Sequence, residues 1–225
     1  MRIGRGPLSA PIGAVLFDLD CTLYPPECGL LAEIDRNITQ FIEHHLSLPH
    51  DEADALRRAY FDEFGTTIRG LHGYHGSSVV DYYAAVYDLD PFQYVSADPR
   101  LADLLGRLQA TRAIFTNGTA PYAQRVLEAL GVADLFVGIF DIVFAGYDGK
   151  PNESFYRAVA EELRLPLDQC LVVDDLRRNV AAGCRLGMPG IWVDWYQTAP
   201  CPCNDVDLVL RSVYELPEAV PWLFS

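Results

Sequence analysis

Short runs of apolar residues alternate with amphipathic segments along most of this 225-residue chain. The run from Ala14 to Asp18 ends in an acid and predicts a buried strand. Strands are predicted in the same way at 113–116, 139–144, 171–174, 190–194 and 207–210. Helices are predicted between them at 100–108, 121–130, 151–163 and 179–186. Strands that alternate with helices of about ten residues predict an α/β fold with a doubly wound, mostly parallel sheet.

One long segment departs from this alternation and predicts only helices. Apolar residues recur at helical spacing over 30–48, 51–64 and 77–87. The pairs Pro25-Pro26 and Asp90-Pro91 break the chain on either side. We therefore expect an α/β core made of residues 1–25 and 91–225, with an all-helical insert at 26–90.

The charge balance argues against polyanionic partners. Lys and Arg number 17 and Asp and Glu number 31, so the net charge is −14. Nucleic acid or an anionic membrane would be repelled over most of such a surface. The chain has no run of about 18 apolar residues that would predict a membrane span, and the segment 1–11 lacks the apolar run of a secretory signal.

The six cysteines predict a reducing, cytoplasmic compartment, because they are too few for a disulfide scaffold. Cys170 and Cys184 lie in apolar context and are expected in the core. The pair Cys201 and Cys203 lacks the second pair that a zinc site requires, so a plain loop is expected there.

Polar residues stand where several predicted strands end, the place where α/β sheets gather functional groups. Taken singly, each is more often a helix cap or turn residue than a catalyst. They are Asp18 and Asp20 after the first strand, Thr116 and Asn117 after the next, Lys150 before a helix, and Asp174 and Asp175 after a third strand.

Together these residues predict a site for phosphoryl chemistry. Four carboxylates in one crevice would repel one another, and a hard cation such as Mg²⁺ relieves that repulsion. Thr116, Asn117 and Lys150 add hydrogen-bond donors and one positive charge, which suits a phosphoryl group. The chain has no glycine-rich phosphate loop of the Walker or G-x-G-x-x-G type.

The four segments, in this order, resemble the haloacid dehalogenase (HAD) superfamily of phosphohydrolases. The run from Asp18 to Thr22 matches its D-x-D-x-T signature, and Thr116, Lys150 and the pair Asp174-Asp175 match its second, third and fourth motifs. The resemblance implies that Asp18 is the nucleophile and Asp20 the general acid and base. It also implies Mg²⁺ held by Asp18, Asp20, Asp174 and Asp175, with the backbone carbonyl of Asp20 reaching the metal. The helical insert looks like the C1 cap of that family.

A narrower resemblance points to pyrimidine 5′-nucleotidases that hydrolyse UMP or CMP. It covers the segments 60–71, 115–118, 134–136 and 174–179. The expected partner is then a small phosphorylated metabolite, bound by a monomer or homodimer. Three alternatives stay open: a phosphatase for a sugar phosphate or phosphoglycolate, a carbon–halogen hydrolase, and a catalytically silent binding or regulatory module.

The helical insert holds further candidates for substrate contact. Arg69 could bind the base or the phosphate, or form a surface ion pair with Asp62 or Glu63. The rings of residues 60, 61 and 64 are expected mostly in the helix core, although one of them could stack on a base. Arg177 and Arg178 are expected on a solvated helix face. All five histidines lie in the insert, so none is expected to carry the chemistry.

Overall fold

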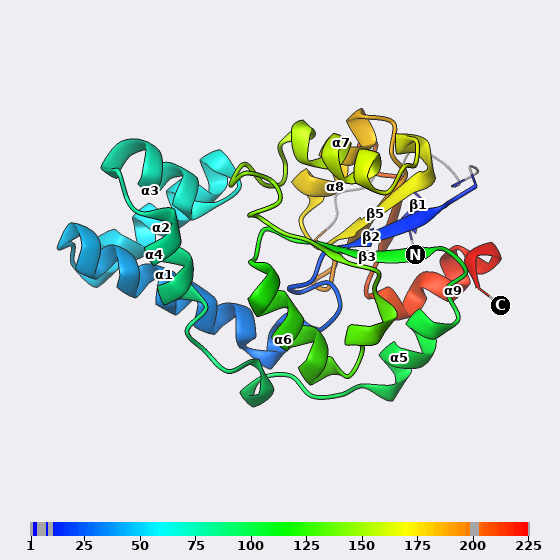
Figure 1. Cartoon of the computed structure of the whole chain (residues 1–225), viewed down its shortest axis with the longest axis horizontal. Coiled ribbons are helices and arrows are strands. Elements are labelled where there is room, and N and C mark those ends of the chain that lie inside the picture. The colour runs from blue at the N-terminus through cyan, green and yellow to red at the C-terminus, as the bar shows by residue number, and fades with distance from the viewer. Residues whose placement is uncertain (1, 4–7, 9–10, 199–202, 225) are drawn as a thin grey trace.

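The computed structural model describes residues 2–3, 8, 11–198 and 203–224, and its centre is a seven-stranded sheet (Figure 1). The strand order is β1-β7-β6-β5-β2-β3-β4. Every neighbouring pair is parallel except β1 with β7. This confirms the predicted doubly wound α/β fold. The strands are β1 (Arg2–Ile3), β2 (Ala14–Phe17), β3 (Thr111–Phe115), β4 (Ile139–Phe140), β5 (Cys170–Asp174), β6 (Gly190–Val193) and β7 (Leu208–Leu210).

Helices cover both faces of the sheet, which is why the central strands are apolar throughout. In β2, Val15 and Phe17 pack into the larger apolar cluster, whereas Leu16 points to the other face and joins a second cluster. The first face carries α5 (Pro99–Gly106), α6 (Ala120–Leu130) and α9 (Leu216–Ala219), and the second carries α7 (Glu153–Glu162) and α8 (Arg177–Arg185) (Figure 1). Short 3₁₀ helices lie at Pro26–Cys28, Pro91–Gln93, Ala133–Leu135, Leu167–Gln169, Val213–Glu215 and Pro221–Leu223.

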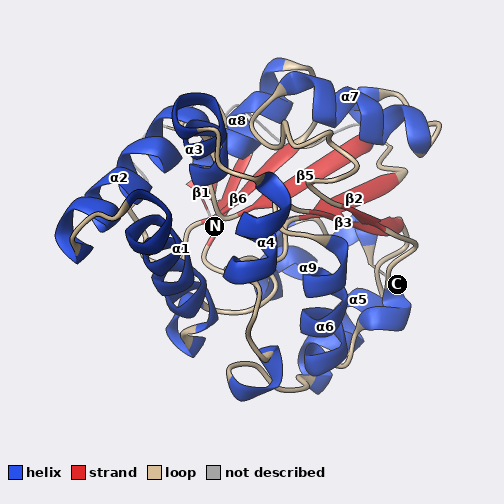
Figure 2. Ribbon diagram, turned by 60° about the vertical axis from the view of Figure 1, so that its left-hand side comes forward, coloured by secondary structure: helices blue, strands red, loops and turns tan. Residues whose placement is uncertain are grey.

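Four helices of the insert gather beyond one end of the strands, apart from the sheet (Figures 1 and 2). They are α1 (Leu30–Leu46), α2 (His50–Phe64), α3 (Thr67–His75) and α4 (Val79–Val86), and we call them the helical lobe. The sequence did not predict α3 as a separate helix, because Gly70 and Gly73 lower its helix propensity. Gly70 is needed there, since a Cβ atom would collide with the ring of Tyr60.

Two predicted elements need correction. The strand expected at 139–144 ends at Phe140, because the carboxylate of Asp141 accepts hydrogen bonds from the backbone of Ala120 and Phe144 and holds a turn. The helix expected from Pro151 begins at Glu153, where Asn152 is the N-cap.

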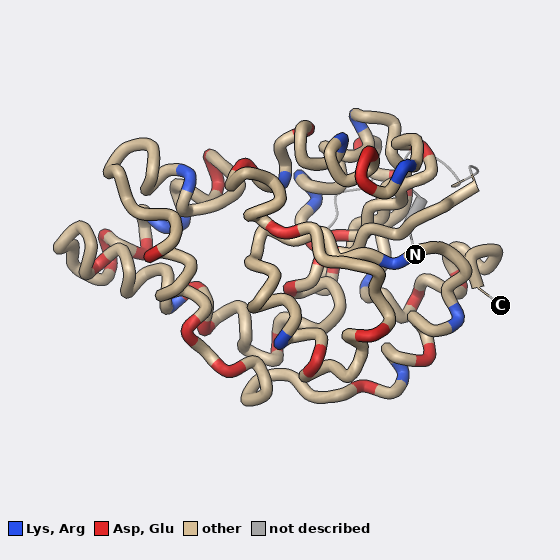
Figure 3. The backbone as a smooth tube through the Cα atoms, in the orientation of Figure 1, with Lys and Arg blue, Asp and Glu red and all other residues tan. Residues whose placement is uncertain are grey.

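Acidic positions are spread over the helical lobe and the α/β core (Figure 3). Cys170, Cys184 and Cys203 are buried, whereas Cys201 and Pro202 lie outside the described residues. Of the segment 1–11, residues 1, 4–7 and 9–10 also lie outside them. Within the described ranges, no helix combines the length and the apolar character that crossing a bilayer requires.

Candidate active site

The two central strands bring their acids to one edge of the sheet. Phe17 of β2 is in register with Val173 of β5, so Asp18 directly follows one strand where Asp174 ends the next. The backbone N–H of Asp18 extends this ladder by donating to the carbonyl of Val173 at 2.8 Å. Parallel pairing therefore places the predicted first and fourth motifs side by side.

Lys150 is the chain's only lysine, and its ammonium group lies between these acids. Its Nζ donates to Asp18 Oδ1 at 2.7 Å, to Asp174 Oδ2 at 2.7 Å and to the carbonyl of Phe115 at 2.6 Å. The side chain is 1% exposed. An ammonium group has three donors, so all of them are engaged.

Asn117 supports Lys150 from the neighbouring strand end. Its Oδ1 accepts from the backbone N–H of Lys150 at 2.7 Å, and its Nδ2 donates to the Lys150 carbonyl at 2.9 Å. Both ends of the amide are thus used to fix the backbone from which the lysine side chain projects. The predicted contact between Asn117 and phosphate stays a prediction.

The site contains several carboxylates but only the single positive charge of Lys150. Burial raises the pKa of Asp18 to about 7; Lys150 opposes the rise, and Asp174 and Asp20 add to it. Burial, with Asp18 and Asp174 nearby, raises the pKa of Asp175 well above its ordinary value. Such a cluster calls for further positive charge.

The cluster fits a divalent cation. Asp18, Asp174 and Asp175 each offer a carboxylate oxygen, and these atoms lie within 4.8 Å of one another. Opposite oxygen ligands of Mg²⁺ are about 4.2 Å apart, so the spread of these oxygens is close to that of three ligands on one ion. Asn179 donates to both oxygens of Asp174, and its own Oδ1 is buried without a hydrogen-bond partner in the described structure.

Asp20 is held differently, by two phenols that the sequence analysis did not identify. Tyr24 Oη donates to Asp20 Oδ1 at 2.5 Å, and Tyr122 Oη donates to the same oxygen at 2.6 Å. Burial raises the pKa of Asp20, and the hydrogen bonds from Tyr122 and Tyr24 oppose the rise. Both phenols bind the same oxygen, Oδ1, and Asp20 also lines the cavity described below.

Two threonines complete the sheet edge. Thr22 Oγ1 donates to Asp18 Oδ2 at 3.1 Å, so both oxygens of this carboxylate are fixed. The buried Thr116 accepts the backbone N–H of Gly118 at 2.9 Å, which leaves its hydroxyl hydrogen available to an oxygen ligand.

The helical lobe covers a cavity of about 270 Å³, whose floor is formed by Asp18, Asp20, Thr116, Asn117, Lys150 and Asp175. That volume is slightly below the ~300–1,000 Å³ usual for small-molecule sites. Asp35 on α1 and Arg57 on α2 also line it. The rest of the wall is mainly aliphatic and aromatic, and it includes Leu31, Ile34, Ile38, Phe61, Tyr82, Tyr83, Val86 and Tyr87.

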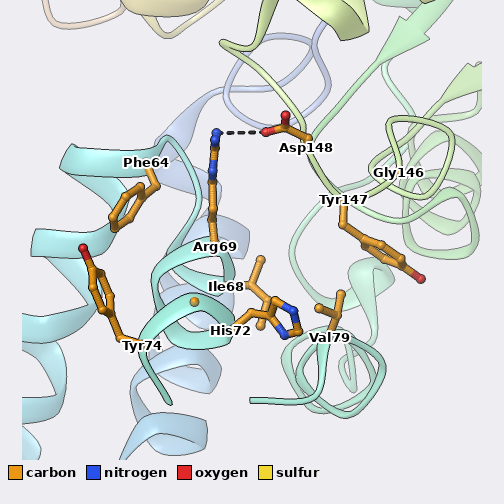
Figure 4. A pocket seen from close by; sticks show the side chains of 10 residues that line it. Phe64, Ile68, Arg69, His72, Tyr74, Val79, Gly146, Tyr147 and Asp148 are labelled. Atoms are coloured by element: carbon orange, nitrogen blue, oxygen red, sulfur yellow. Dashed lines mark ion pairs between the residues drawn. The ribbon is translucent and has the colours of Figure 1, made fainter. Parts of the chain in front are cut away.

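The structure places Arg69 outside this cavity, in a separate hollow of about 550 Å³ (Figure 4). Arg69 Nη1 lies 2.8 Å from Asp148 Oδ1, so its ion-pair partner is neither Asp62 nor Glu63. Ile68 lines both hollows. A direct substrate contact by Arg69 stays a prediction.

The prediction for Arg178 is wrong. Its Nη1 donates to the carbonyl of Phe61 at 2.9 Å, and its guanidinium lies 4.0 Å from the centre of the Phe61 ring. Arg177 instead pairs with Asp205. The helix α8 begins two residues earlier than predicted and turns Arg178 toward the lobe, so this residue ties the lobe to the core.

Residues 12–187 match the family model of haloacid dehalogenase-like hydrolases. The chain therefore belongs to that family and is a hydrolase, which confirms the resemblance drawn from its four motifs.

One curated relative is a phosphatase, and the name of a second links it to phosphate metabolism. The chain is 31% identical over 195 residues to a phosphoglycolate phosphatase of Rhodospirillum rubrum, with 78% of this chain and 77% of that protein covered. It is 28% identical over 190 residues to Phosphate metabolism protein 8 of Saccharomyces cerevisiae, with 76% of this chain covered. The match spans 58% of that yeast protein.

Solved structures agree with the fold. A HAD-hydrolase of Bacillus subtilis, bound to magnesium, superposes with a TM-score of 0.61 at 17% identity, covering 93% of this chain and 98% of that one. An L-2-haloacid dehalogenase of Xanthobacter autotrophicus gives a TM-score of 0.57 at 18% identity, covering 93% and 98%. At these identities the likeness shows the fold alone.

Proposed function

We propose that this hydrolase is a Mg²⁺-dependent phosphomonoesterase that hydrolyses pyrimidine nucleoside monophosphates such as UMP and CMP. The observation that carries the proposal is the buried group of Asp18, Lys150 and two further acids, set beneath a cavity with aromatic walls. The phosphatase among the relatives supports the same reaction class.

In the proposed reaction, a carboxylate oxygen of Asp18 attacks phosphorus. A new P–O bond forms to Asp18 as the bond from phosphorus to the nucleoside oxygen breaks. Asp20 Oδ2 gives its proton to that leaving oxygen. Asp20 then takes a proton from a water molecule, which attacks the aspartyl-phosphate, releases inorganic phosphate and restores Asp18.

The surrounding groups hold the phosphoryl oxygens and balance their charge. The Thr116 hydroxyl can donate to one oxygen. Lys150 offsets the negative charge of the acids. A phosphoryl oxygen that displaces one of the present acceptors of Lys150 would accept a hydrogen bond from its ammonium group. Mg²⁺, bound by Asp18, Asp174, Asp175 and the backbone carbonyl of Asp20, would supply the further charge neutralisation that a phosphate dianion requires.

The cavity walls favour a nucleoside as the leaving group. Apolar and aromatic side chains suit a ribose and a flat base, whereas glycolate would place a carboxylate against them. Within the described residues the cavity is lined by four acids and by two cations, Lys150 and Arg57, so a further carboxylate would meet a net negative charge. Phosphoglycolate is the second candidate, because a phosphoglycolate phosphatase is 31% identical.

Phosphate release from a panel of substrates tests the proposal. UMP, CMP, AMP, ribose 5-phosphate and phosphoglycolate are compared with Mg²⁺ and with EDTA. We expect UMP and CMP to have the highest kcat/KM, and EDTA to abolish turnover. A preference for phosphoglycolate would favour the second candidate, full activity in EDTA would exclude the metal, and no turnover at all would favour a silent binding module. The cytoplasmic location and the monomeric or homodimeric state stay predictions.

A further inference from the structure

One ion pair interrupts the apolar wall of the cavity on the side of the helical lobe. Arg57 Nη1, from α2, lies 2.8 Å from Asp35 Oδ1, from α1. Apart from the acids and the lysine at the sheet edge, these two are the charged residues that line the cavity in the described part of the chain. The Arg57 side chain is 15% exposed and that of Asp35 is 41% exposed.

The pair still offers hydrogen-bond donors and an acceptor to a ligand. Arg57 Nε and Nη2 lie 3.0 Å and 2.9 Å from Asp54 Oδ1. With the bond to Asp35, three of the five guanidinium N–H groups are engaged, and two remain. Arg57 approaches Asp35 at Oδ1, and the Asp35 side chain is 41% exposed and lines the cavity, so Oδ2 can accept a hydrogen bond from a ligand.

Stability does not account for the position of this pair. Burial raises the pKa of Asp35, although Arg57 opposes the rise. A partly buried pair adds little net stability, because desolvation and solvent screening offset its attraction, and apolar contacts between α1 and α2 would hold the helices as well. A few polar groups in an otherwise apolar wall are the usual means by which a site orients its ligand.

We propose that Asp35 and Arg57 bind the polar edge of a pyrimidine base and make the site specific for it. This inference rests on the proposed nucleotidase function. Uracil presents its N3–H beside a carbonyl oxygen, and cytosine presents its 4-amino group beside N3. With the base shifted by one ring position between the two cases, the carboxylate of Asp35 accepts the N–H, and the guanidinium of Arg57 donates to the neighbouring acceptor. Adenine shows a similar edge, so the size of the cavity must exclude it.

Three variants test this assignment. Asp35→Asn keeps the shape but replaces an acceptor by a donor, and Arg57→Gln removes the guanidinium. Arg58→Gln is the matched control, because Arg58 is the next residue, is 63% exposed and pairs with the other oxygen of Asp54. For each, kcat and KM are measured with UMP and with p-nitrophenyl phosphate, which has no base.

We expect Asp35→Asn and Arg57→Gln to lower kcat/KM for UMP by ~10- to 100-fold, mainly through KM, as for one or two lost charge-assisted hydrogen bonds. For p-nitrophenyl phosphate the loss should be smaller, about threefold or less on the same scale. The control should behave as the parent. If Arg57→Gln fails to fold, Asp35→Asn decides alone, with its thermal melting curve showing that it is folded.

Two outcomes would overturn the inference, and they are distinguishable. If the parent hydrolyses p-nitrophenyl phosphate but neither UMP nor CMP, the proposed function fails and the inference fails with it. If the parent prefers UMP but the two variants lose equally on both substrates, or lose nothing, only the assignment of Asp35 and Arg57 fails.

Discussion

Replacing Lys150 by methionine removes the one cation that Asp18 and Asp174 share. The two carboxylates are only 11% and 1% exposed, so water replaces the ammonium group poorly. Leaving a buried charge without its partner costs about 3–5 kcal/mol. In a chain of this size, each 1 kcal/mol shifts the melting temperature by about 2–4 °C, which gives a loss of about 6–20 °C.

The cost should also depend on pH. In the parent, Lys150 opposes the rise that takes the pKa of Asp18 to about 7, so the variant must have a still higher pKa at this residue. Above about pH 7 the folded variant then keeps a proton that its unfolded chain, with an ordinary pKa of about 3.9, has released. The native state binds more protons than the unfolded state, so stability falls as the pH rises. The gap between variant and parent therefore widens from pH 6 to pH 9.

Urea denaturation in EDTA at both pH values measures this gap. Arg157→Met is the matched control, because Arg157 is 59% exposed, forms a surface pair with Glu153, and should cost less than about 1 kcal/mol. A Lys150→Met protein within 1 kcal/mol of the parent at pH 9, or a gap that is equal at pH 6 and pH 9, would refute the reasoning.

Three further predictions follow from single residues. Asp18→Asn should lower kcat by several orders of magnitude because the nucleophile is lost, and residual activity within about tenfold of the parent would contradict its role. Arg69→Ala should change kcat/KM for UMP by less than about threefold, since Arg69 lies outside the cavity, whereas a ~10- to 100-fold loss would support a direct contact with substrate. Asp98→Ala should cost about 1–2 kcal/mol at pH 7 in urea denaturation, because Asp98 caps α5 and accepts hydrogen bonds from Arg100 and Tyr214. These bonds hold the pKa of Asp98 well below its usual range. The loss of stability caused by Asp98→Ala should therefore shrink as the pH falls below about 4. A loss that stays constant down to about pH 2 would contradict the assignment of the stabilisation to ionised Asp98.

The core of the site could be predicted because its residues stand at the ends of apolar runs. Once the strands are parallel, Asp18 and Asp174 must meet at one edge of the sheet, and local sequence is enough to find both. Lys150 could be placed near them by its motif. Its complete engagement with two acids and a carbonyl could not, because that depends on side-chain packing across β2, β3 and β5.

The contacts that the sequence did not reveal join segments far apart in the chain. Tyr122 reaches Asp20 across 102 positions, and Arg178 reaches Phe61 across 117. No local sequence pattern distinguishes Tyr122 or Arg178 from an ordinary helix residue. Within the lobe, helical spacing predicted apolar faces correctly but did not indicate that Arg57, rather than Arg69, lines the cavity.

The single lysine gives the chain one side-chain amine whose chemical modification can be followed. Lys150 is the only side-chain amine that an acylating reagent can convert to an amide, and it is 1% exposed beneath the helical lobe. Acylation of Lys150 requires the lobe to separate from the sheet edge, or the edge itself to open, so its rate measures the population of such open forms. Because the modified peptide would contain residue 150, mass spectrometry can follow that opening in the unaltered protein, and a ligand that closes the lobe should slow the modification.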